Sequence, residues 1–268
     1  MKALVGHTGF VGSNLCRQMA FDAFYNSKNI EDIRGQTFDL LVCAGMPAVK
    51  WLANKEPAKD RQVLESLWSA LATVKVRTFV LISTVDVYPQ PDGLGEQFDC
   101  RTVSGTPYGV HRLMLEQRVI ETFAAHVVRL PALFGPGLKK NVLFDLMHKN
   151  CLENIQPAST FQWYDLAELA ADLAAVQQEN LPVVNLVPEP LQTSRIIQTC
   201  FPQLAGAVGA AAGPAVHYAL QTRHGSQLRA GQRQSAPFLY DAEESLRRIS
   251  AFVHSQRSEH GLAKAGAA

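Results

Sequence analysis

The sequence lacks the features that mark several large classes of protein. Its formal net charge is only +1, so no excess of positive charge predicts a nucleic-acid partner. No apolar run approaches the ~18 residues that a membrane span needs. The five cysteines are scattered and include no Cys-x-x-Cys pair. This pattern favours a reducing compartment over a disulfide framework.

Missing motifs narrow the chemistry further. No Gly-x-Ser-x-Gly elbow is present, so nothing supports a hydrolase. His217 and His224, and likewise His254 and His260, have the wrong spacing to bind a metal from one helical face, and we expect no metal site. The first residues, MKALVGHTGF, enter a glycine-containing turn at once. We therefore expect no signal peptide and a cytoplasmic location.

Short apolar runs alternate with longer segments of helical periodicity through the first half of the chain. Strands are predicted at 2–6, 21–27, 38–45, 77–84 and 126–131, and helices at 10–21, 57–74 and 106–124. This alternation predicts βαβ units and an α/β fold with a doubly wound parallel sheet of the Rossmann type.

The second half is less regular. We expect residues 1–135 to form a dinucleotide-binding domain whose sheet is completed by elements within 159–190, and residues 136–254 to form mainly a small C-terminal substrate lobe. A tail at 255–268 is predicted to be disordered. The remaining expected elements are helices at 142–150, 164–178 and 241–253, a strand at 182–187, and a connector at 204–215.

Three glycines, Gly6, Gly9 and Gly12, follow the first predicted strand and lead into a predicted helix in GHTGFVG. Small residues let the backbone approach a diphosphate, and the helix N-terminus offers free N–H groups and a partial positive charge. The order of strand, turn and helix favours nucleotide binding over a purely structural turn.

This Gly-x-x-Gly-x-x-Gly spacing resembles the extended short-chain dehydrogenase/reductase family, the NAD(P)-dependent sugar epimerases and dehydratases. Later segments resemble that family in the same order: LISTVDVYP (81–89), TPYGVHR (106–112), RLPALFGPG (129–137) and FQWYDLAELA (161–170). The resemblance implies a nicotinamide cofactor, a catalytic hydroxyl at Thr84, a catalytic tyrosine at Tyr108, and Arg112 where the family has lysine. It also implies a possible homodimer formed through helices 57–74 and 106–124.

The predicted cofactor site combines the glycine loop with residues after the second, third and fifth strands and with the tyrosine helix. Its members are Gly6, Thr8, Gly9, Phe10, Val11, Gly12, Asn26, Ser27, Lys28, Ala44, Gly45, Tyr108, Arg112, Leu130 and Pro131.

Tyr108 and Arg112 are four residues apart on a predicted helix, so both lie on one face. A phenol with an ordinary pKa near 10 needs a neighbouring positive charge to act as a base at neutral pH. Arginine keeps the charge, but its planar guanidinium is bulkier than the lysine ammonium that holds the ribose in the family. We predict a working site, the alternative being a buried tyrosine beside a solvated arginine.

Asp86 has two interpretations. The family's dehydratases carry Thr-Asp-Glu-Val-Tyr in this segment, whereas this chain has Thr-Val-Asp-Val-Tyr at 84–88. One carboxylate could act as an acid or base on the substrate. A lone Asp at a strand end is more often a turn residue, which is the interpretation we favour.

The residues after the second predicted strand bear on the choice of cofactor. An acid there binds the ribose 2′-hydroxyl of NAD, but the chain has YNSKN at 25–29. Asn26, Ser27 and Lys28 could instead hold a 2′-phosphate, so NADP is favoured over NAD. Lys28 as an ordinary surface charge is the alternative.

Candidate substrate residues lie mostly in the second half. Lys139, Lys140, Asn141 and Arg223 could grip a diphosphate, although a solvated basic loop explains them as well. Trp163 could line the substrate cleft.

These observations predict an NAD(P)-dependent oxidoreductase or epimerase that acts on a sugar or a nucleotide-sugar-like molecule. Tyr108 would transfer the proton, and Thr84 would bind the reacting oxygen. Two alternatives stay open: an NADP-dependent carbonyl reductase of a smaller substrate, and a catalytically silent dinucleotide-binding regulator or scaffold.

Overall fold

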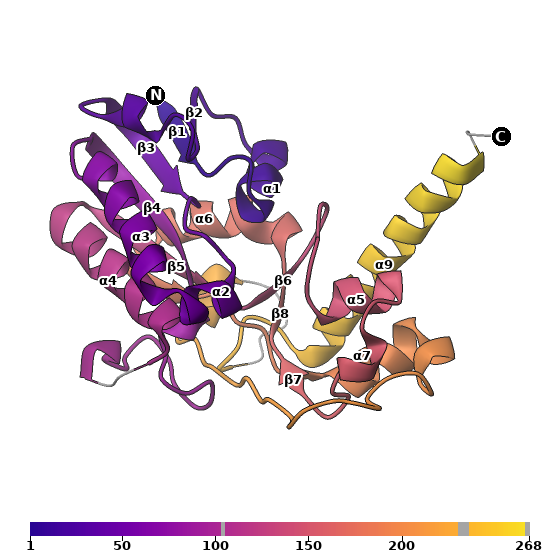
Figure 1. Cartoon of the computed structure of the whole chain (residues 1–268). Coiled ribbons are helices and arrows are strands. Elements are labelled where there is room, and N and C mark those ends of the chain that lie inside the picture. Colours follow the sequence, from indigo (N-terminus) through magenta and orange to yellow (C-terminus); the bar gives the residue numbers. More distant parts are fainter. Residues whose placement is uncertain (103–104, 230–235, 266–268) are drawn as a thin grey trace.

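The structure is a computed structural model that describes residues 1–102, 105–229 and 236–265. Its centre is a six-stranded sheet in the order β2-β1-β3-β4-β5-β9, and every neighbouring pair is parallel (Figure 1). The strands are β1 (Lys2–Val5), β2 (Ala23–Tyr25), β3 (Thr37–Cys43), β4 (Lys75–Thr84), β5 (Ala125–Leu130) and β9 (Val183–Asn185). The predicted Rossmann-like parallel sheet is confirmed.

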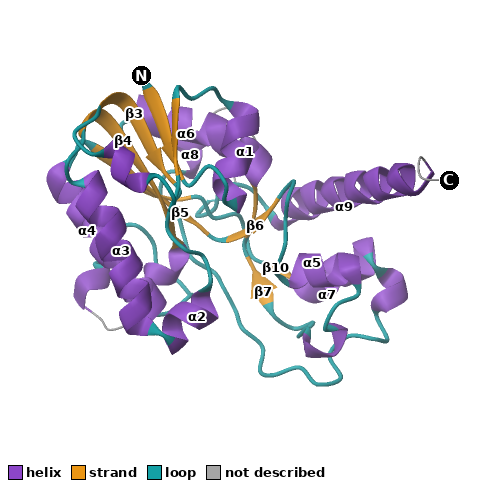
Figure 2. Ribbon diagram, turned by 45° about the horizontal axis from the view of Figure 1, so that its top comes forward, coloured by secondary structure: helices purple, strands orange, loops and turns teal. Residues whose placement is uncertain are grey.

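Helices cover both faces of the sheet, as the alternation of side chains along each strand requires (Figure 2). Leu4 belongs to one core with α1 (Phe10–Gln18) and α6 (Leu169–Gln178). Its neighbour Val5 belongs to the core under α3 (Pro57–Leu71) and α4 (Pro107–Thr122). Strands buried on both sides explain why they appear in the sequence as nearly continuous apolar runs.

A separate core holds the C-terminal part together. Phe134, Trp163 and Phe201 meet there under α5 (Val142–His148), α7 (Thr193–Cys200) and the long helix α9 (Ala242–Ala265). Two small sheets border this part: β6 (Ala132–Phe134) with β8 (Trp163–Asp165), and β7 (Thr160–Phe161) with β10 (Leu191–Gln192). α9 projects away from the rest of the chain in both ribbon views.

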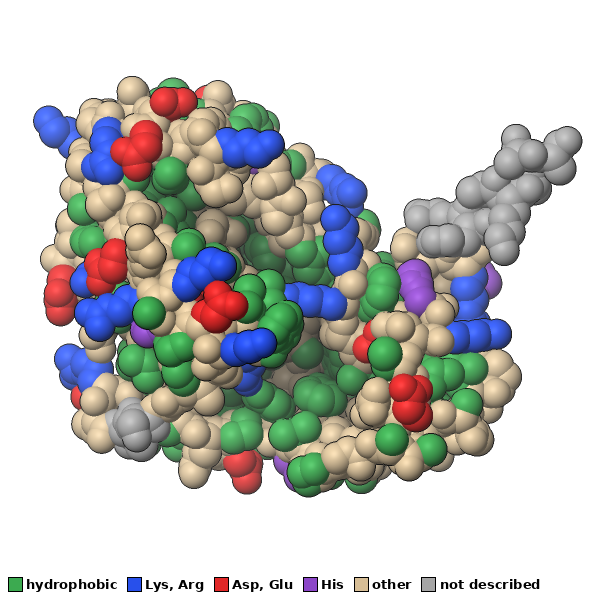
Figure 3. Space-filling model, viewed as in Figure 1, with side chains coloured by type: hydrophobic (Ala, Val, Ile, Leu, Met, Phe, Trp, Pro, Cys, Tyr) green, Lys and Arg blue, Asp and Glu red, His purple; other side chains and the backbone are tan. Residues whose placement is uncertain are grey.

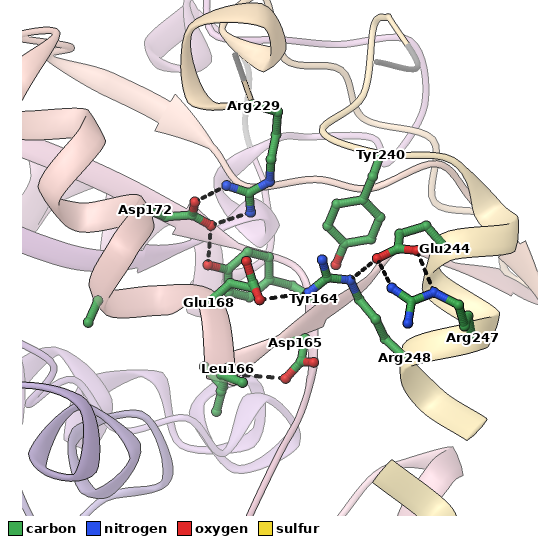
Figure 4. A network of polar contacts seen from close by, with 12 residues as sticks. Tyr164, Asp165, Leu166, Glu168, Asp172, Arg229, Tyr240, Glu244, Arg247 and Arg248 are labelled. Atoms are coloured by element: carbon green, nitrogen blue, oxygen red, sulfur yellow. Dashed lines mark hydrogen bonds and ion pairs between the residues drawn. The ribbon is translucent and has the colours of Figure 1, made fainter. Parts of the chain in front are cut away.

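A buried polar network joins α6 and β8 to the C-terminal helices (Figure 4). Asp172 of α6 accepts a bond from Tyr164 and two from Arg229, which follows α8 (Gly225–Leu228). On α9, Arg248 pairs with both Glu168 and Glu244. Asp172 and Arg229 are at most 4% exposed and paired, while the partly exposed pair of Arg248 and Glu168 ties α9 to the segment before α6.

Several elements differ from the sequence predictions. The six-residue helix α2 (Lys50–Lys55), the helix α7 and the short strands β7 and β10 were not predicted. The helix predicted at 164–178 begins only at Leu169, because 163–165 pair as strand β8. α9 continues to Ala265, through most of the predicted disordered tail, while residues 266–268 lie outside the described part. None of the helices within that part is both long and apolar enough to cross a membrane.

Candidate active site

The glycine loop follows β1, and β1 lies between β2 and β3 in the sheet. The strand order therefore reverses direction between β1 and β3, and ligands of doubly wound sheets bind at such a switch point. Gly6 has a φ of +86°, and a Cβ on it would come within 2.4 Å of the Ala44 carbonyl oxygen. A Cβ on Gly12 would meet the Gly6 oxygen at 2.1 Å. α1 starts after Gly9 with no side-chain cap and no acid in its first turn. Its first N–H groups thus have no side-chain cap, an arrangement that suits an anionic ligand.

The other predicted cofactor residues lie around this loop or along the same sheet edge. Thr8 is exposed, Phe10 and Val11 are half-buried at the start of α1, and Ala44 and Gly45 follow β3. Leu130 ends β5 and Pro131 follows it.

The segment after β2 forms a compact turn. The Lys28 N–H donates to the Asn26 side chain at 2.8 Å, and the Asn26 N–H donates to the Asn29 side chain at 2.7 Å. The side chains of Ser27 and Lys28 are exposed. This turn leaves the Lys28 ammonium free to approach a ligand at the end of β2.

Thr84 and Tyr108 meet at this edge of the sheet. Thr84 is the last residue of β4, and its side chain lies near enough to the Tyr108 phenol to lower the pKa of that phenol. A Cβ on Gly109 would lie 2.0 Å from the Asp86 carbonyl oxygen, so only glycine lets α4 pack this closely on the turn after β4. The close contact holds Tyr108 against the strand end.

Arg112 packs against the Tyr108 ring, but its side chain is buried and does not reach the surface. Its guanidinium lies 3.9 Å from the centroid of the Tyr108 ring and donates to Asp60 at 2.5 and 2.9 Å. A further bond goes to the Pro47 carbonyl at 2.6 Å. Arg112 is only 1% exposed, so the ribose contact predicted from the sequence finds no accessible guanidinium here. The reason is Asp60, whose carboxylate draws the arginine towards α3.

A second polar cluster lies beside Tyr108. The Lys50 ammonium donates to Asp86 at 2.7 Å and to the Tyr218 hydroxyl at 3.2 Å. Tyr218 in turn donates to Asp86 at 3.0 Å. Lys50 and Tyr218 were not predicted as site residues. Asp86 lies in a 3-10 turn, Val85–Val87, as its favoured interpretation requires, but its carboxylate also joins this cluster.

Burial and nearby charges act in opposite directions on Tyr108. Removal from water raises its pKa, and the negative charge of Asp86 raises it further. The charges of Arg112 and Lys50 and the hydrogen bond with Thr84 lower it, but the net pKa stays raised. The phenol is therefore protonated at neutral pH.

The other predicted substrate residues differ in whether a ligand could reach them. Lys139 and Arg223 have exposed side chains, which leaves them available to a ligand. Asn141 caps α5 by accepting from the Phe144 N–H at 3.0 Å and donates to the Leu133 carbonyl. Trp163 is 1% exposed within the C-terminal core, so it does not line a cleft. Its neighbour Phe161 instead stacks on Tyr218, with ring centroids 5.9 Å apart.

The space-filling view shows a hollow near the centre of this face, with Lys and Arg side chains at its rim (Figure 3). A different cavity of about 770 Å³ lies at the opposite edge of the sheet, among Lys2, Asp39, Thr78 and Ala125. Those residues lie at or near the starts of their strands. Ligands of doubly wound sheets bind at the carboxyl ends, so this second cavity is not the cofactor site.

Residues 36–179, just over half of the chain, match the model of the NAD dependent epimerase/dehydratase family. The chain belongs to this family. Its members are enzymes, and the family description agrees with the glycine loop and the Thr84–Tyr108 pair at one edge of the sheet. Among curated proteins, none matches the sequence significantly.

Solved structures show where the family fold recurs. UDP-N-acetylglucosamine 4-epimerase from Methanobrevibacter ruminantium M1, in complex with UDP-N-acetylmuramic acid, matches with a TM-score of 0.74 and 13% identity over 97% of this chain and 100% of that one. UDP-glucuronic acid 4-epimerase from Bacillus cereus, in complex with UDP-glucuronic acid and NAD, matches with a TM-score of 0.65 and 16% identity over 96% and 100%. TunA, an NAD-dependent NDP-hexosamine 5,6-dehydratase, matches with a TM-score of 0.69 and 18% identity over 94% and 97%. At these identities the likeness establishes a shared fold.

Proposed function

We propose that the protein is an NAD(P)-dependent oxidoreductase or epimerase that acts on a hydroxyl-bearing carbon of a sugar, most simply a nucleotide sugar. The observation that carries this proposal is the neighbouring pair of Thr84, at the end of β4, and Tyr108, near the start of α4, at the same sheet edge as the glycine loop. The solved relatives of the same fold are named as enzymes of nucleotide sugars, which supports the choice of substrate class.

In the proposed reaction, Tyr108 exchanges a proton with the substrate oxygen while Thr84 hydrogen-bonds that oxygen. A bound nicotinamide would supply or accept the hydride at the same carbon. Because the Tyr108 pKa is raised, the resting phenol is ready to protonate an oxygen that gains charge. The reverse direction needs a cation close to the hydroxyl.

Arg112 contributes mainly by position. It lies on the Tyr108 ring, and its terminal nitrogens are bound to Asp60, the Pro47 carbonyl and the Tyr108 carbonyl. We therefore propose that Arg112 holds the Tyr108 side chain in position on α4 and does not make the contact with the ribose that was predicted from the sequence.

The proposed cofactor is NADP(H) in preference to NAD(H). It rests on the exposed Lys28 and on the turn that Asn26 makes with it, since an ammonium at this place suits a 2′-phosphate. The solved relatives are named with NAD and so lend this preference no support. The choice depends on the local residues alone.

We also propose a homodimer through α3 and α4. These helices lie side by side on the outside of the sheet in both ribbon views. They expose Val63 at 43% and Ile120 at 44%, and apolar side chains on such a face are typical of an interface. Sedimentation of the wild type against the Val63→Asp variant tests this.

Mass spectrometry of the nucleotide released from the freshly purified, denatured protein tests the proposed function. NADP or NAD in stoichiometric amount supports a retained cofactor. If none is released, titration with each cofactor follows, and failure to bind either one would refute the proposal.

A second experiment separates an enzyme from a silent dinucleotide-binding protein. Panels of nucleotide sugars and of simple carbonyl compounds are screened for turnover with the wild type. Tyr108→Phe should then abolish turnover and leave cofactor affinity unchanged. Tyr240→Phe, which removes a hydroxyl that donates to the Trp163 carbonyl and to no site residue, is the matched control. Full activity of Tyr108→Phe would refute the proposed proton transfer.

A further inference from the structure

The cation that the family places four residues after the catalytic tyrosine is not accessible in this chain. Arg112 is 1% exposed, and its charge is compensated by Asp60 at 2.5 Å. A guanidinium in a buried ion pair cannot turn towards a substrate without leaving Asp60 as an uncompensated buried charge, which is strongly unfavourable. The site therefore needs another positive group if one is to reach the substrate.

The short helix α2 brings such a group to Tyr108. Asn54 of α2 accepts a hydrogen bond from the Tyr108 N–H at 3.0 Å. Lys50 lies four residues earlier on the same helix, so both side chains belong to one face. The Lys50 ammonium ends on Asp86 at 2.7 Å, and the Asp86 N–H in turn donates to Thr84 at 3.1 Å. Lys50, Thr84 and Tyr108 thus surround one turn.

The side chain of Lys50 is 43% exposed and that of Asp86 is 20% exposed, in contrast with the sealed Arg112. The third partner, Tyr218, comes from the C-terminal part of the chain and bonds to both. The cluster is therefore accessible to solvent and connects the Rossmann sheet with the C-terminal part of the chain. It lies beside the hydroxyls of Thr84 and Tyr108.

We propose that the accessible cation of this active site is Lys50, delivered by α2, and not Arg112. Asp86 and Tyr218 hold the ammonium in the unliganded protein. A substrate whose hydroxyls donate to Asp86 frees the ammonium to interact with the oxygen on which Tyr108 acts. This inference rests on the proposed role of Tyr108 and adds to it the residue that favours the phenolate.

The charged and titratable groups facing Tyr108 are Arg112 on its own helix, Asp60 on α3, Lys50 on α2, Asp86 after β4, and Tyr218. Burial alone would lower the pKa of Lys50, but Asp86 and Tyr218 outweigh it and raise that pKa. Lys50 therefore stays positive through the neutral range, as the role requires.

The test measures the titration of Tyr108 itself and needs neither substrate nor cofactor, so it can fail or succeed independently of the proposed function. The full-length chain is labelled with tyrosine carrying 13C at Cζ, and Tyr108→Phe assigns the resonance. The matched pair is Asp86→Asn/Lys50→Arg and Asp86→Asn/Lys50→Met, and the single variant Lys50→Met is compared with the wild type. Lys55→Met, on the same helix with an exposed side chain, is the control.

A guanidinium at position 50 stays charged at the alkaline pH where Tyr108 ionises. The acid constant of Tyr108 should therefore be roughly tenfold higher in Asp86→Asn/Lys50→Arg than in Asp86→Asn/Lys50→Met, which is one pH unit on the titration curve. In the background that keeps Asp86, Lys50→Met should lower the acid constant of Tyr108 relative to the wild type, and Lys55→Met should not change the titration. Equal titration of Asp86→Asn/Lys50→Arg and Asp86→Asn/Lys50→Met would overturn the proposal.

Discussion

Arg112 stacks on the ring of Tyr108, with its guanidinium carbon 3.9 Å from the ring centroid. The contact is with the ring face, while the charge itself is paired with Asp60 on a neighbouring helix. The replacement of the family's lysine by arginine at position 112 therefore changes the role of the residue. The arginine ties the tyrosine helix to α3, and in our proposal other groups contact the ligands.

The buried pair of Asp60 and Arg112 should be a large contributor to folding. We expect Asp60→Asn to lower the free energy of unfolding by about 3–5 kcal/mol, because it strands a buried guanidinium. Urea unfolding followed by circular dichroism measures this. The control is Glu65→Gln, which breaks the Arg118 pair between the same helices at 30% and 38% exposure and should cost at most about 1 kcal/mol. Equal losses in the two variants would contradict the prediction.

The same pair predicts a dependence of stability on acid. Burial would raise the pKa of Asp60, but hydrogen bonds from Arg112 and His111 outweigh it, and the net pKa is lowered. A carboxyl whose pKa is lower in the folded state contributes stability above its unfolded pKa of about 3.9 and loses it as the pH falls through the folded value. The stability gap between wild type and Asp60→Asn should therefore be constant from neutral pH to about pH 5 and shrink below about pH 4. A gap unchanged at pH 3 would count against the pair.

Gly109, the single glycine of α4, is predicted to be sensitive to any side chain. Alanine normally favours a helix by about 1 kcal/mol over glycine. Here its Cβ would lie 2.0 Å from the Asp86 carbonyl oxygen, so we expect Gly109→Ala to destabilise by about 1–3 kcal/mol. It should also shift the Tyr108 resonance.

The control for that variant is Gly105→Ala, whose Cβ would meet nothing closer than Val110 at 3.9 Å. Thermal unfolding should place it within about 0.5 kcal/mol of wild type. If the two alanine variants were equally stable, the close approach of α4 to the turn after β4 would not limit the packing.

Lys28 tests the cofactor preference. Lys28→Met should weaken NADP(H) binding about tenfold, or 1.4 kcal/mol, and leave NAD(H) binding unchanged, because only NADP carries the 2′-phosphate. Fluorescence titration with NADPH and NADH measures both constants. Lys75→Met, at the start of β4 and the opposite sheet edge, is the matched control. A parallel loss for both cofactors would indicate a general effect on the loop.

Much of the fold could be predicted because each central strand is an apolar run that the local sequence shows. β3, β4 and β5 are apolar runs buried on both faces, so each gives a local signal. α2 has only six residues, too few for helical periodicity to show. The start of α6 was misplaced because Trp163 and Tyr164 pair in β8, a contact with β6 that no local pattern reveals.

The candidate site likewise combines residues that local sequence motifs show with residues that only long-range contacts bring together. The glycine loop and the spacing of Tyr108 and Arg112 are local, so the sequence contains them. The partner that buries Arg112 is 52 residues away, and Lys50 and Tyr218 are 168 residues apart. Only the assembled chain brings these groups together, which is why a ribose contact was expected of Arg112 and no role was expected of Lys50.

The last strand of the sheet, β9, comes from residues 183–185 and pairs with β5, after the chain has already passed through α5, the small sheet of β6 and β8, and α6. The two parts are thus interwoven in sequence. A fragment ending near residue 135 would present β5 as an open edge, and such edges template aggregation. During synthesis the nucleotide-binding half must wait for more than fifty further residues before its sheet is closed, so its folding is governed by late, long-range pairing.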